Sequence, residues 1–251
     1  MLGKFKVIGM AIFLIVFSGC GGGDSSSGRA PTKNATTIVG TAGASGSADG
    51  IGVAARFNFP FDITSDGTNL YVTDFNNHTI RKIVIATGAV TTIAGTAGAA
   101  GSADGTGAAA RFSLPARLTM DGTSTNLYVT DSSNNTIRKI VIATGAVTTI
   151  AGHPGVIGIT DGFGLTAFFN NPVGITTDGT NLYVADTNSS TIRQIVIATG
   201  AVTTVAGVPL VQGSADGSAK VATFNLPFGI TTVGTDLYVA DTGNNTIRKI
   251  H

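Results

Sequence analysis

Aspartate and arginine side chains recur at matching places along this chain and are the first candidates for chemistry. The aspartates are Asp74, Asp131, Asp186 and Asp241, and the arginines are Arg81, Arg138, Arg193 and Arg248. Each aspartate ends a short apolar run and precedes polar residues rich in asparagine. A carboxylate at such a place can accept hydrogen bonds from nearby backbone N–H groups, as in an Asx turn. The same side chains could instead face a ligand. The residues considered for that binding surface are Asp74, Asn77, Asp131, Asn135, Asp186, Asp241 and Asn245.

The arginines, together with Lys82, Lys139 and Lys249, could form a basic ring. We expect them to pair with nearby aspartates and to remain solvated, as surface ion pairs usually do. No aromatic residue alternates with these charges, so a stacking platform for single-stranded nucleic acid is missing from the pattern. The formal net charge of +1 also gives no reason to expect a nucleic-acid partner.

Metal and nucleophile chemistry finds few candidates. The three histidines, His78, His153 and His251, share no position in the pattern, and a zinc site would need three or four convergent ligands. The Asp-Gly pairs that start at Asp104 and Asp161 each offer one carboxylate, whereas calcium takes six to eight oxygens, so a turn is the expected role. The sequence therefore predicts no metal site, no cofactor and no assignable catalytic residue.

These side chains belong to a repeated unit. All four tyrosines of the chain occupy the same place in it, and subtraction of their numbers gives spacings of 57, 55 and 55 residues. The tyrosines are Tyr71, Tyr128, Tyr183 and Tyr238. A fixed period of this size is typical of propellers and arrays, whose single units cannot bury a core alone.

Each unit reads as four short antiparallel strands. In the second unit we expect strands at residues 116–120, 126–130, 136–142 and 147–151, separated by turns rich in Gly and Asp. With 35 glycines and apolar runs of Val, Ile and Thr, this composition indicates an all-β protein. Four strands per unit describe a propeller blade.

The pattern resembles the NHL repeat. In the third unit the matching segments are residues 172–175 (Pro-Val-Gly-Ile), 178–179 (Asp-Gly), 182–186 (Leu-Tyr-Val-Ala-Asp) and 191–193 (Thr-Ile-Arg). The match recurs four times in register over about residues 36–251, with Gln194 standing where the other units have Lys. The resemblance implies a β-propeller of NHL-type blades. In this family some cytoplasmic members bind RNA through a basic face, whereas the export signal described below makes RNA an unexpected partner here.

The ends of the repeat region bear on ring closure. Residues 36–40 resemble a fourth strand such as residues 148–152, while the fourth unit contains three strands. If residues 36–40 complete the last blade, four blades close into a ring and two sheet edges disappear. The alternative is an open arc that forms a ring with another copy.

One position departs from the repeat. Two residues after the blade proline the third and fourth units have Gly174 and Gly229, whereas the first two units have Asp62 and Arg117. Innermost strands line the channel of a propeller, so opposite charges on neighbouring blades could meet at its mouth. Asp62 and Arg117 are therefore either a structural ion pair or part of a ligand site.

The N-terminus resembles an export signal. Lys4 and Lys6 precede an apolar run at residues 7–17, which is shorter than the roughly 20 residues that span a bilayer. Residues 17–20 (Phe-Ser-Gly-Cys) resemble the bacterial lipobox, which implies lipid modification of Cys20, and Gly21 favours the outer membrane. An ordinary cleaved signal with an incidental cysteine is the alternative. We thus expect a lipoprotein signal peptide at 1–19, a flexible tether at 20–35 and the propeller at 36–251.

The sequence favours a binding module over an enzyme. We expect a lipid-anchored envelope protein, facing the periplasm or the cell surface, that binds a protein, or a glycan or small ligand, through its loop face. Contact with the membrane is expected through the lipid anchor only. The alternative is a propeller hydrolase or lyase with its site in the channel near Asp62 and Arg117.

Overall fold

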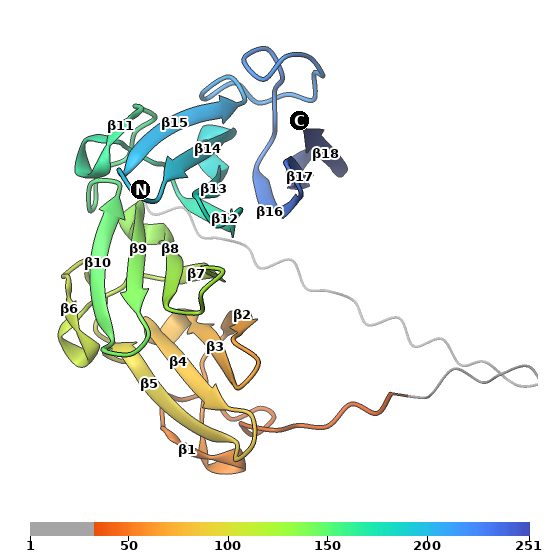
Figure 1. Cartoon of the computed structure of the whole chain (residues 1–251). Coiled ribbons are helices and arrows are strands. Elements are labelled where there is room, and N and C mark those ends of the chain that lie inside the picture. The colour runs from red at the N-terminus through yellow and green to blue at the C-terminus, as the bar shows by residue number, and fades with distance from the viewer. Residues whose placement is uncertain (1–32) are drawn as a thin grey trace, which may run out of the picture. The chain divides into compact units, whose positions relative to one another are not determined.

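The computed structural model describes residues 33–251 and shows an all-β, four-bladed β-propeller (Figure 1). The first blade contains β2 (Pro60–Ser65), β3 (Asn69–Asp74), β4 (Thr79–Val84) and β5 (Ala89–Gly95). The second contains β7 (Pro115–Met120), β8 (Asn126–Asp131), β9 (Thr136–Val141) and β10 (Ala146–Ala151). The third contains β12 (Pro172–Thr177), β13 (Asn181–Asp186), β14 (Thr191–Val196) and β15 (Ala201–Ala206), and the fourth β16 (Pro227–Val233), β17 (Asp236–Asp241) and β18 (Thr246–Ile250). The predicted fold class and blade number are confirmed.

The strands within each blade follow one another as antiparallel hairpins. Gly67 and Gly88 turn the first blade with φ of +87° and +66°, which glycine adopts at no steric cost. At the opposite end, β3 leads through the 3₁₀ turn η2 (Phe75–Asn77) into β4, and η4 (Ser132–Asn134), η6 (Thr187–Ser189) and η7 (Thr242–Asn244) repeat this turn. In Figure 1, β2, β7, β12 and β16 lie toward the middle of the row of blades, with β5, β10 and β15 on the outside.

Three of the sheets contain a fifth strand that the sequence did not predict. The long connection before each blade adds a two-residue strand to the outer edge of that blade: β1 (Gly50–Ile51) pairs with β5, β6 (Gly105–Thr106) with β10, and β11 (Gly162–Phe163) with β15. Each then passes through a second kind of 3₁₀ turn, η1 (Gly52–Ala54), η3 (Gly107–Ala109) or η5 (Gly164–Thr166). The connections are therefore fastened to the blades. None of the helical turns in residues 33–251 is long and apolar enough to cross a membrane.

The hydrophobic core lies between the blades. Tyr71 and Ile80 of the first blade pack against Phe112, Leu118 and Val129 of the second, and all five side chains are at most 4% exposed. Equivalent clusters join the second blade to the third and the third to the fourth. Burial on both faces of the sheet explains the nearly continuous apolar runs of the second and third blades, which have a neighbour on either side.

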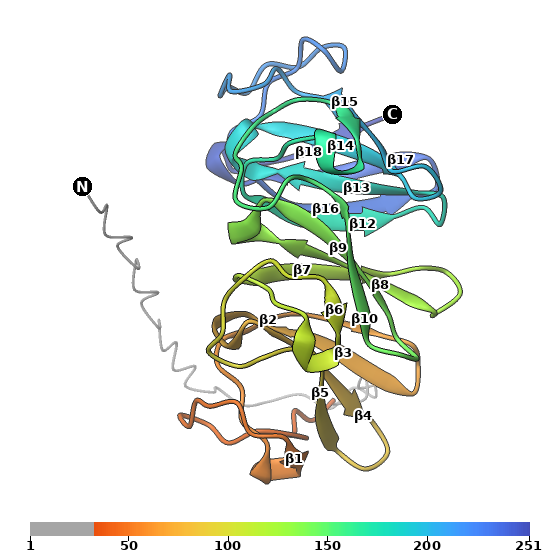
Figure 2. The same ribbon diagram turned by 90° about the vertical axis from the view of Figure 1, so that its left-hand side faces the viewer.

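The expected closure of the ring does not occur. The fourth sheet contains β16, β17 and β18 alone, and within the described chain residues 37–40 form no strand and pair with none of its strands. This segment lies along the first blade instead, where the Gly40 N–H donates to the Gly52 carbonyl at 3.0 Å. Figure 2 shows the blades following one another from the first at one end to the fourth at the other. Three rigid blade-to-blade contacts fix the rotation between neighbours, and that rotation leaves β18 apart from residues 37–40.

Candidate functional site

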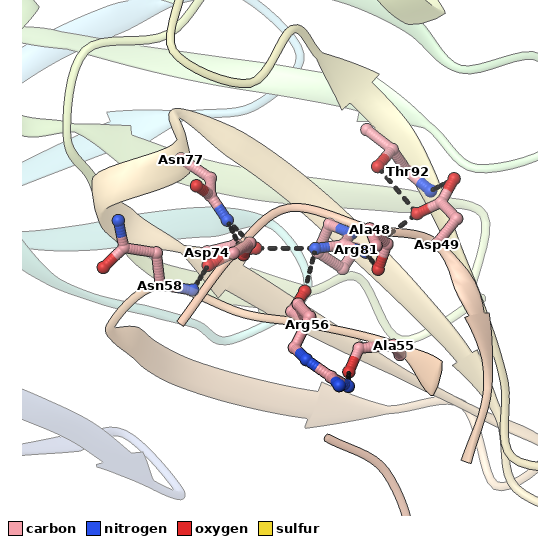
Figure 3. Close-up of polar contacts among 10 residues, drawn as sticks. Ala48, Asp49, Ala55, Arg56, Asn58, Asp74, Asn77, Arg81 and Thr92 are labelled. Atoms are coloured by element: carbon pink, nitrogen blue, oxygen red, sulfur yellow. Dashed lines mark hydrogen bonds and ion pairs between the residues drawn. The ribbon is translucent and has the colours of Figure 1, made fainter. Parts of the chain in front are cut away.

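The repeated aspartate and arginine form a buried clamp in each blade, shown for the first blade in Figure 3. Asp74 accepts hydrogen bonds from the Asn58 backbone N–H, the Asn77 amide and the Arg81 guanidinium, each at 2.7 Å. The other side of that guanidinium donates to Asp49 at 2.8 Å, and its carbon lies 4.9 Å from the centroid of the Phe57 ring. A planar guanidinium suits this arrangement because its five N–H donors form a rigid fork.

The clamp ties the long connection to the blade. Arg81 donates to the carbonyls of Ala48 and Arg56, both at 3.0 Å, and the Asn77 amide donates to the carbonyl of Gly46 at 2.7 Å. The aspartate of the Asp-Gly pair completes the link, since Asp49 accepts from both the backbone and the hydroxyl of Thr92 on β5. These contacts place the connections on the same face as the turns that follow Asp74 and its equivalents.

The other blades repeat these contacts. The ion pairs are Asp131–Arg138–Asp104, Asp186–Arg193–Asp161 and Asp241–Arg248–Asp216, with N–O distances of 2.7 to 3.2 Å. The predicted pairing of the arginines is confirmed, but their predicted solvation is wrong. The side chains of Arg81, Arg138 and Arg193 are 0% exposed, and that of Arg248 is 11% exposed. The arginines therefore contribute little to any basic surface, and the partly exposed members of the expected ring are mainly the lysines Lys82, Lys139 and Lys249.

The four clamp aspartates are likewise fully buried, so the clamp uses them to hold loops together. Burial raises the pKa of Asp131 and Asp186 to about 6, while their arginine partners and hydrogen-bond donors act in the opposite direction. Asp66, in an exposed turn, behaves differently: hydrogen bonds from Asn69 hold its pKa well below the usual range. Asp66 also accepts from the Tyr71 hydroxyl at 2.9 Å, and burial together with Asp66 raises the pKa of Tyr71 to about 12.

The candidate asparagines occupy two adjacent positions in the turn. Asn77 lies inside the clamp, whereas Asn135 and Asn245 stand one residue later, with φ of +57°, where the chain leaves the turn. The side-chain oxygen Oδ1 of Asn135 accepts a hydrogen bond from the backbone N–H of Asn171, next to the following blade, at 2.8 Å. His78 occupies the same position in the first blade, and its Nδ1 accepts from the Leu114 N–H at 3.1 Å. Burial lowers the pKa of His78.

Asp62 and Arg117 do come together at the inner strands. Their closest oxygen and nitrogen are 3.8 Å apart, and their side chains are 22% and 33% exposed. The other oxygen of Asp62 accepts from the Leu118 N–H at 3.0 Å. At 3.8 Å the pair is a loose ion pair, in contrast to the 2.7 Å contact between Asp74 and Arg81.

An aromatic cluster that the sequence reading missed surrounds this pair. Phe59, Phe61 and Phe75 lie with ring centroids 5.2 to 5.9 Å apart, and Phe61 is 6.2 Å from Phe228 of the fourth blade. The Arg117 guanidinium carbon lies 5.7 Å from the centroid of Phe61 and 5.4 Å from that of Phe228. We call Asp62, Arg117 and these four phenylalanines the channel mouth. It lies where inner strands begin, on the face that carries η2.

The repeat itself held the signal for this cluster. The positions of Phe59 and Phe75 are taken by Leu114 and Ser132 in the second blade, so the aromatic residues depart from the pattern as Asp62 and Arg117 do. Phe59 is 58% exposed and has φ of +59°, a left-handed conformation that a bulky side chain rarely adopts. Equivalent residues in all four blades share this conformation, so it belongs to the entry into the inner strand.

Metal chemistry finds no support in the described part of the chain. Residues 33–251 contain no group of three or more His, Cys, Asp or Glu side chains that could hold a metal ion. Cys20, the expected lipidation site, lies outside the described residues.

Similarity to known proteins agrees with this architecture. NHL repeat-containing protein 2 of Bos taurus is 33% identical over 153 residues, and the alignment covers 56% of this chain and 21% of that protein. The chain is an NHL repeat-containing β-propeller. The human NHL repeat-containing protein 2 is 35% identical over 49% of the chain, and the chloroplastic protein SUPPRESSOR OF QUENCHING 1 of Arabidopsis thaliana is 26% identical over 79%. No protein-family model matches the sequence. This NHL chain spans about a fifth of the length of these relatives, between 18% and 21%.

Solved structures show the same fold. An auxiliary nutrient binding protein from Bacteroides thetaiotaomicron superposes with a TM-score of 0.60 at 21% identity, over 73% of this chain and 45% of that one. Catalytically inactive virginiamycin B lyase from Staphylococcus aureus, in complex with quinupristin, gives a TM-score of 0.54 at 20% identity, over 80% of this chain and 55% of that one. At these identities the likeness shows the β-propeller fold alone and does not extend to function.

Proposed function

We propose that this NHL propeller is a binding module and that its ligand sits at the channel mouth. The observation that carries the proposal is the partly exposed group of Asp62, Arg117 and four phenylalanines, set among clamps whose arginines are buried or nearly so and each paired with two aspartates. Phenylalanine faces stack on the apolar face of a sugar or aromatic ring. The partly exposed Arg117 guanidinium is held by one loose contact, which leaves N–H donors for an acidic group.

The ligand that fits best is a glycan or small molecule that has both a ring face and a carboxylate. Protein binding over the surrounding loop face remains compatible with the same module, because η2, η4, η6 and η7 lie against the inner strands at this end of the blades. The clamps make this face rigid, and loops on a rigid scaffold commonly carry binding sites.

For location we propose the cell envelope, with an anchor at Cys20. The apolar run at residues 7–17 and the lipobox-like residues 17–20 support this proposal. Labelling of the wild type but not of Cys20→Ser by a lipid precursor is the expected result, and an unlabelled wild type would contradict the anchor.

A binding experiment with repeat-derived variants tests the site. An array of oligosaccharides with and without uronic acid residues is probed with the wild type and with Phe75→Ser and Arg117→Gly, which introduce residues that other blades carry at these places. Loss of the aromatic stack or of the cation should raise the Kd for a uronic-acid glycan by tenfold or more. A tenfold rise corresponds to a loss of about 1.4 kcal/mol in binding free energy. The matched control is Phe163→Ser, which removes a phenylalanine that is 68% exposed in a long connection. Glycan binding that is equal in all variants would refute the channel-mouth site.

The same experiment separates the binding module from the alternative. A hydrolase or lyase acting near Asp62 and Arg117 would convert the bound glycan. Mass spectrometry of the recovered ligand should show it unchanged, and a cleaved product that disappears in Asp62→Gly would favour the enzyme.

A further inference from the structure

The three blade-to-blade contacts share one design. Each blade offers the tyrosine of its second strand and the first isoleucine of its third strand to the blade that follows, and we call this its outgoing face. The next blade receives them on its incoming face, which is built from a phenylalanine before its first strand and from apolar residues of its strands. In the first contact these residues include Tyr71 and Ile80 on one side and Phe112 and Leu118 on the other.

Within residues 33–251, two of these faces are not covered by a neighbouring blade. On the outgoing face of the fourth blade, Ile247 is 72% exposed, whereas its equivalents Ile80, Ile137 and Ile192 are 0% exposed. On the incoming face of the first blade, Ile63 is 57% exposed, whereas its equivalent Leu118 is 4% exposed. Together the two faces are the halves of one more contact of the same kind.

Residues 37–40 already occupy part of this missing contact. A groove of about 300 Å³ on the incoming face is lined by Ile38, Val39, Phe57, Ile63 and Leu70, among other residues. The Gly40 N–H donates to the Gly52 carbonyl at 3.0 Å, as Gly152 at the end of β10 donates to Gly164 at 3.1 Å. Residues 37–40 thus stand where the fourth strand of a preceding blade would end, with one edge unpaired in the described chain.

We propose that a second copy of this chain covers these faces head to tail. The β18 strand of one copy pairs antiparallel with residues 37–40 of the other, as β9 pairs with β10. In that ladder Ile137 stands opposite Ala151, so Ile247 of one copy lies opposite Val39 of the other. The strand addition supplies the fourth blade with its missing strand and seats Ile247 on the incoming face.

Closure within one chain is opposed by contacts already formed. The Thr73 hydroxyl donates to the Ala116 carbonyl of the next blade at 2.7 Å, and the Thr130 hydroxyl donates to that of Val173 at 2.8 Å, so the rotation between these blades is fixed. At the inner ends of the first and fourth blades, Phe61 and Phe228 are already 6.2 Å apart. The inner ends of these blades are thus in contact while β18 and residues 37–40 remain unpaired with each other. The proposed contact between copies joins two different faces of the chain. Such a head-to-tail assembly closes into a ring if the rotation between successive copies permits, and otherwise extends as an open filament.

Mass measurement on surface variants is the first test. Analytical ultracentrifugation of the full chain carrying Cys20→Ser should show at least twice the mass of one chain, and Ile247→Asp or Ile63→Asp should reduce it to that of a single chain. Both side chains are exposed in the single chain, so folding is retained, which circular dichroism checks. The control Leu165→Asp, at a side chain that is 51% exposed in η5, should leave the assembly intact. A single chain at all concentrations, or an assembly that Ile247→Asp does not affect, would overturn the proposal.

Mixing identifies the geometry of the contact. Ile247→Asp and Ile63→Asp chains are each single, but an equal mixture retains one intact pair of faces and should form a dimer. A mixture of Ile247→Cys and Val39→Cys chains, both in the Cys20→Ser background, should yield a disulfide-linked dimer on mild oxidation. The double variant Ile247→Cys/Val39→Cys should also link between chains. An internal disulfide with the mobility of one chain would show intramolecular closure and refute the second copy.

Discussion

The clamp and the channel mouth use the same three residue types, aspartate, arginine and phenylalanine, in opposite ways. In the clamp of the second blade, Arg138 is fully buried, contacts two aspartates at 2.7 and 2.8 Å and stacks 5.1 Å from Phe112. At the mouth, Arg117 is 33% exposed, stands 3.8 Å from one aspartate and lies between two phenylalanine rings. The side chains are of the same types, and the two regions differ in how deeply the arginine is buried and in how many of its N–H donors have a close acceptor.

The difference teaches where a ligand can find free hydrogen-bonding capacity. A buried guanidinium whose carboxylates and carbonyls are all at hydrogen-bond distance has no free donor except its Nε, which is buried without a partner in Arg81, Arg138 and Arg193 and likewise in Arg117. A half-exposed guanidinium with one loose partner can change partners at little cost. The frequent, regular pattern therefore holds the fold together, and the irregular positions carry the candidate site.

Replacement of a clamp arginine should have the largest effect. Arg138→Met leaves Asp131 buried and without its cation, which typically costs about 3–5 kcal/mol. Equilibrium urea unfolding should show that loss in the free energy of unfolding. Arg248→Met is the internal comparison, because Arg248 is 11% exposed and its second partner Asp216 is 95% exposed, so a smaller loss is expected. Equal effects of the two substitutions would contradict the burial argument.

The same substitution at the channel mouth should barely change stability. Arg117→Met removes a partly exposed ion pair of the kind that contributes about 0–1 kcal/mol, while its methylene groups retain contact with the phenylalanine rings. Urea unfolding should place Arg117→Met within about 1 kcal/mol of the wild type, and glycan binding should still fall. A loss as large as that of Arg138→Met would show that the mouth is a structural element and remove the main support for a ligand site there.

Much of the fold followed from the sequence because the repeat reports it four times. Strand positions, the Gly turns and the face shared by the connections all rest on local chemistry that every unit repeats. The burial of Arg81 did not follow, because a charged residue in an alternating strand reads as solvated until the connection that covers it is placed. The open ring was not predicted for a similar reason. Residues 36–40 do match a fourth strand in sequence, but ring closure also depends on the rotation between neighbouring blades, which is set by packing between blades and cannot be read from one unit.

The channel mouth shows the complementary limit. Asp62 and Arg117 were recognised because they break the repeat, whereas Phe59 and Phe75 break it too and were not singled out. The contact between Phe61 and Phe228 joins two strands whose residues are 167 positions apart in sequence. A comparison of the units with one another, position by position, would have found the phenylalanines but not the contact.

The smallest expected effect concerns His78, the one titratable side chain among the four residues that follow the clamp turns. Its neutral Nδ1 accepts from the Leu114 N–H, and burial lowers its pKa in the folded state below the ordinary 6.5. The unfolded chain therefore binds the proton first, so the contribution of His78 to stability is complete above pH 6.5 and is lost as the pH falls toward its folded pKa. His78→Asn places at this position the residue that accepts from Asn171 in the next blade, and it cannot titrate. The melting temperature of the wild type should drop more than that of His78→Asn between pH 7.5 and pH 5, because the titration of Asp131 and Asp186 is common to both proteins and cancels in the difference. Parallel pH profiles would mean that the Leu114 N–H does not depend on His78, and that this turn is held by the clamp alone.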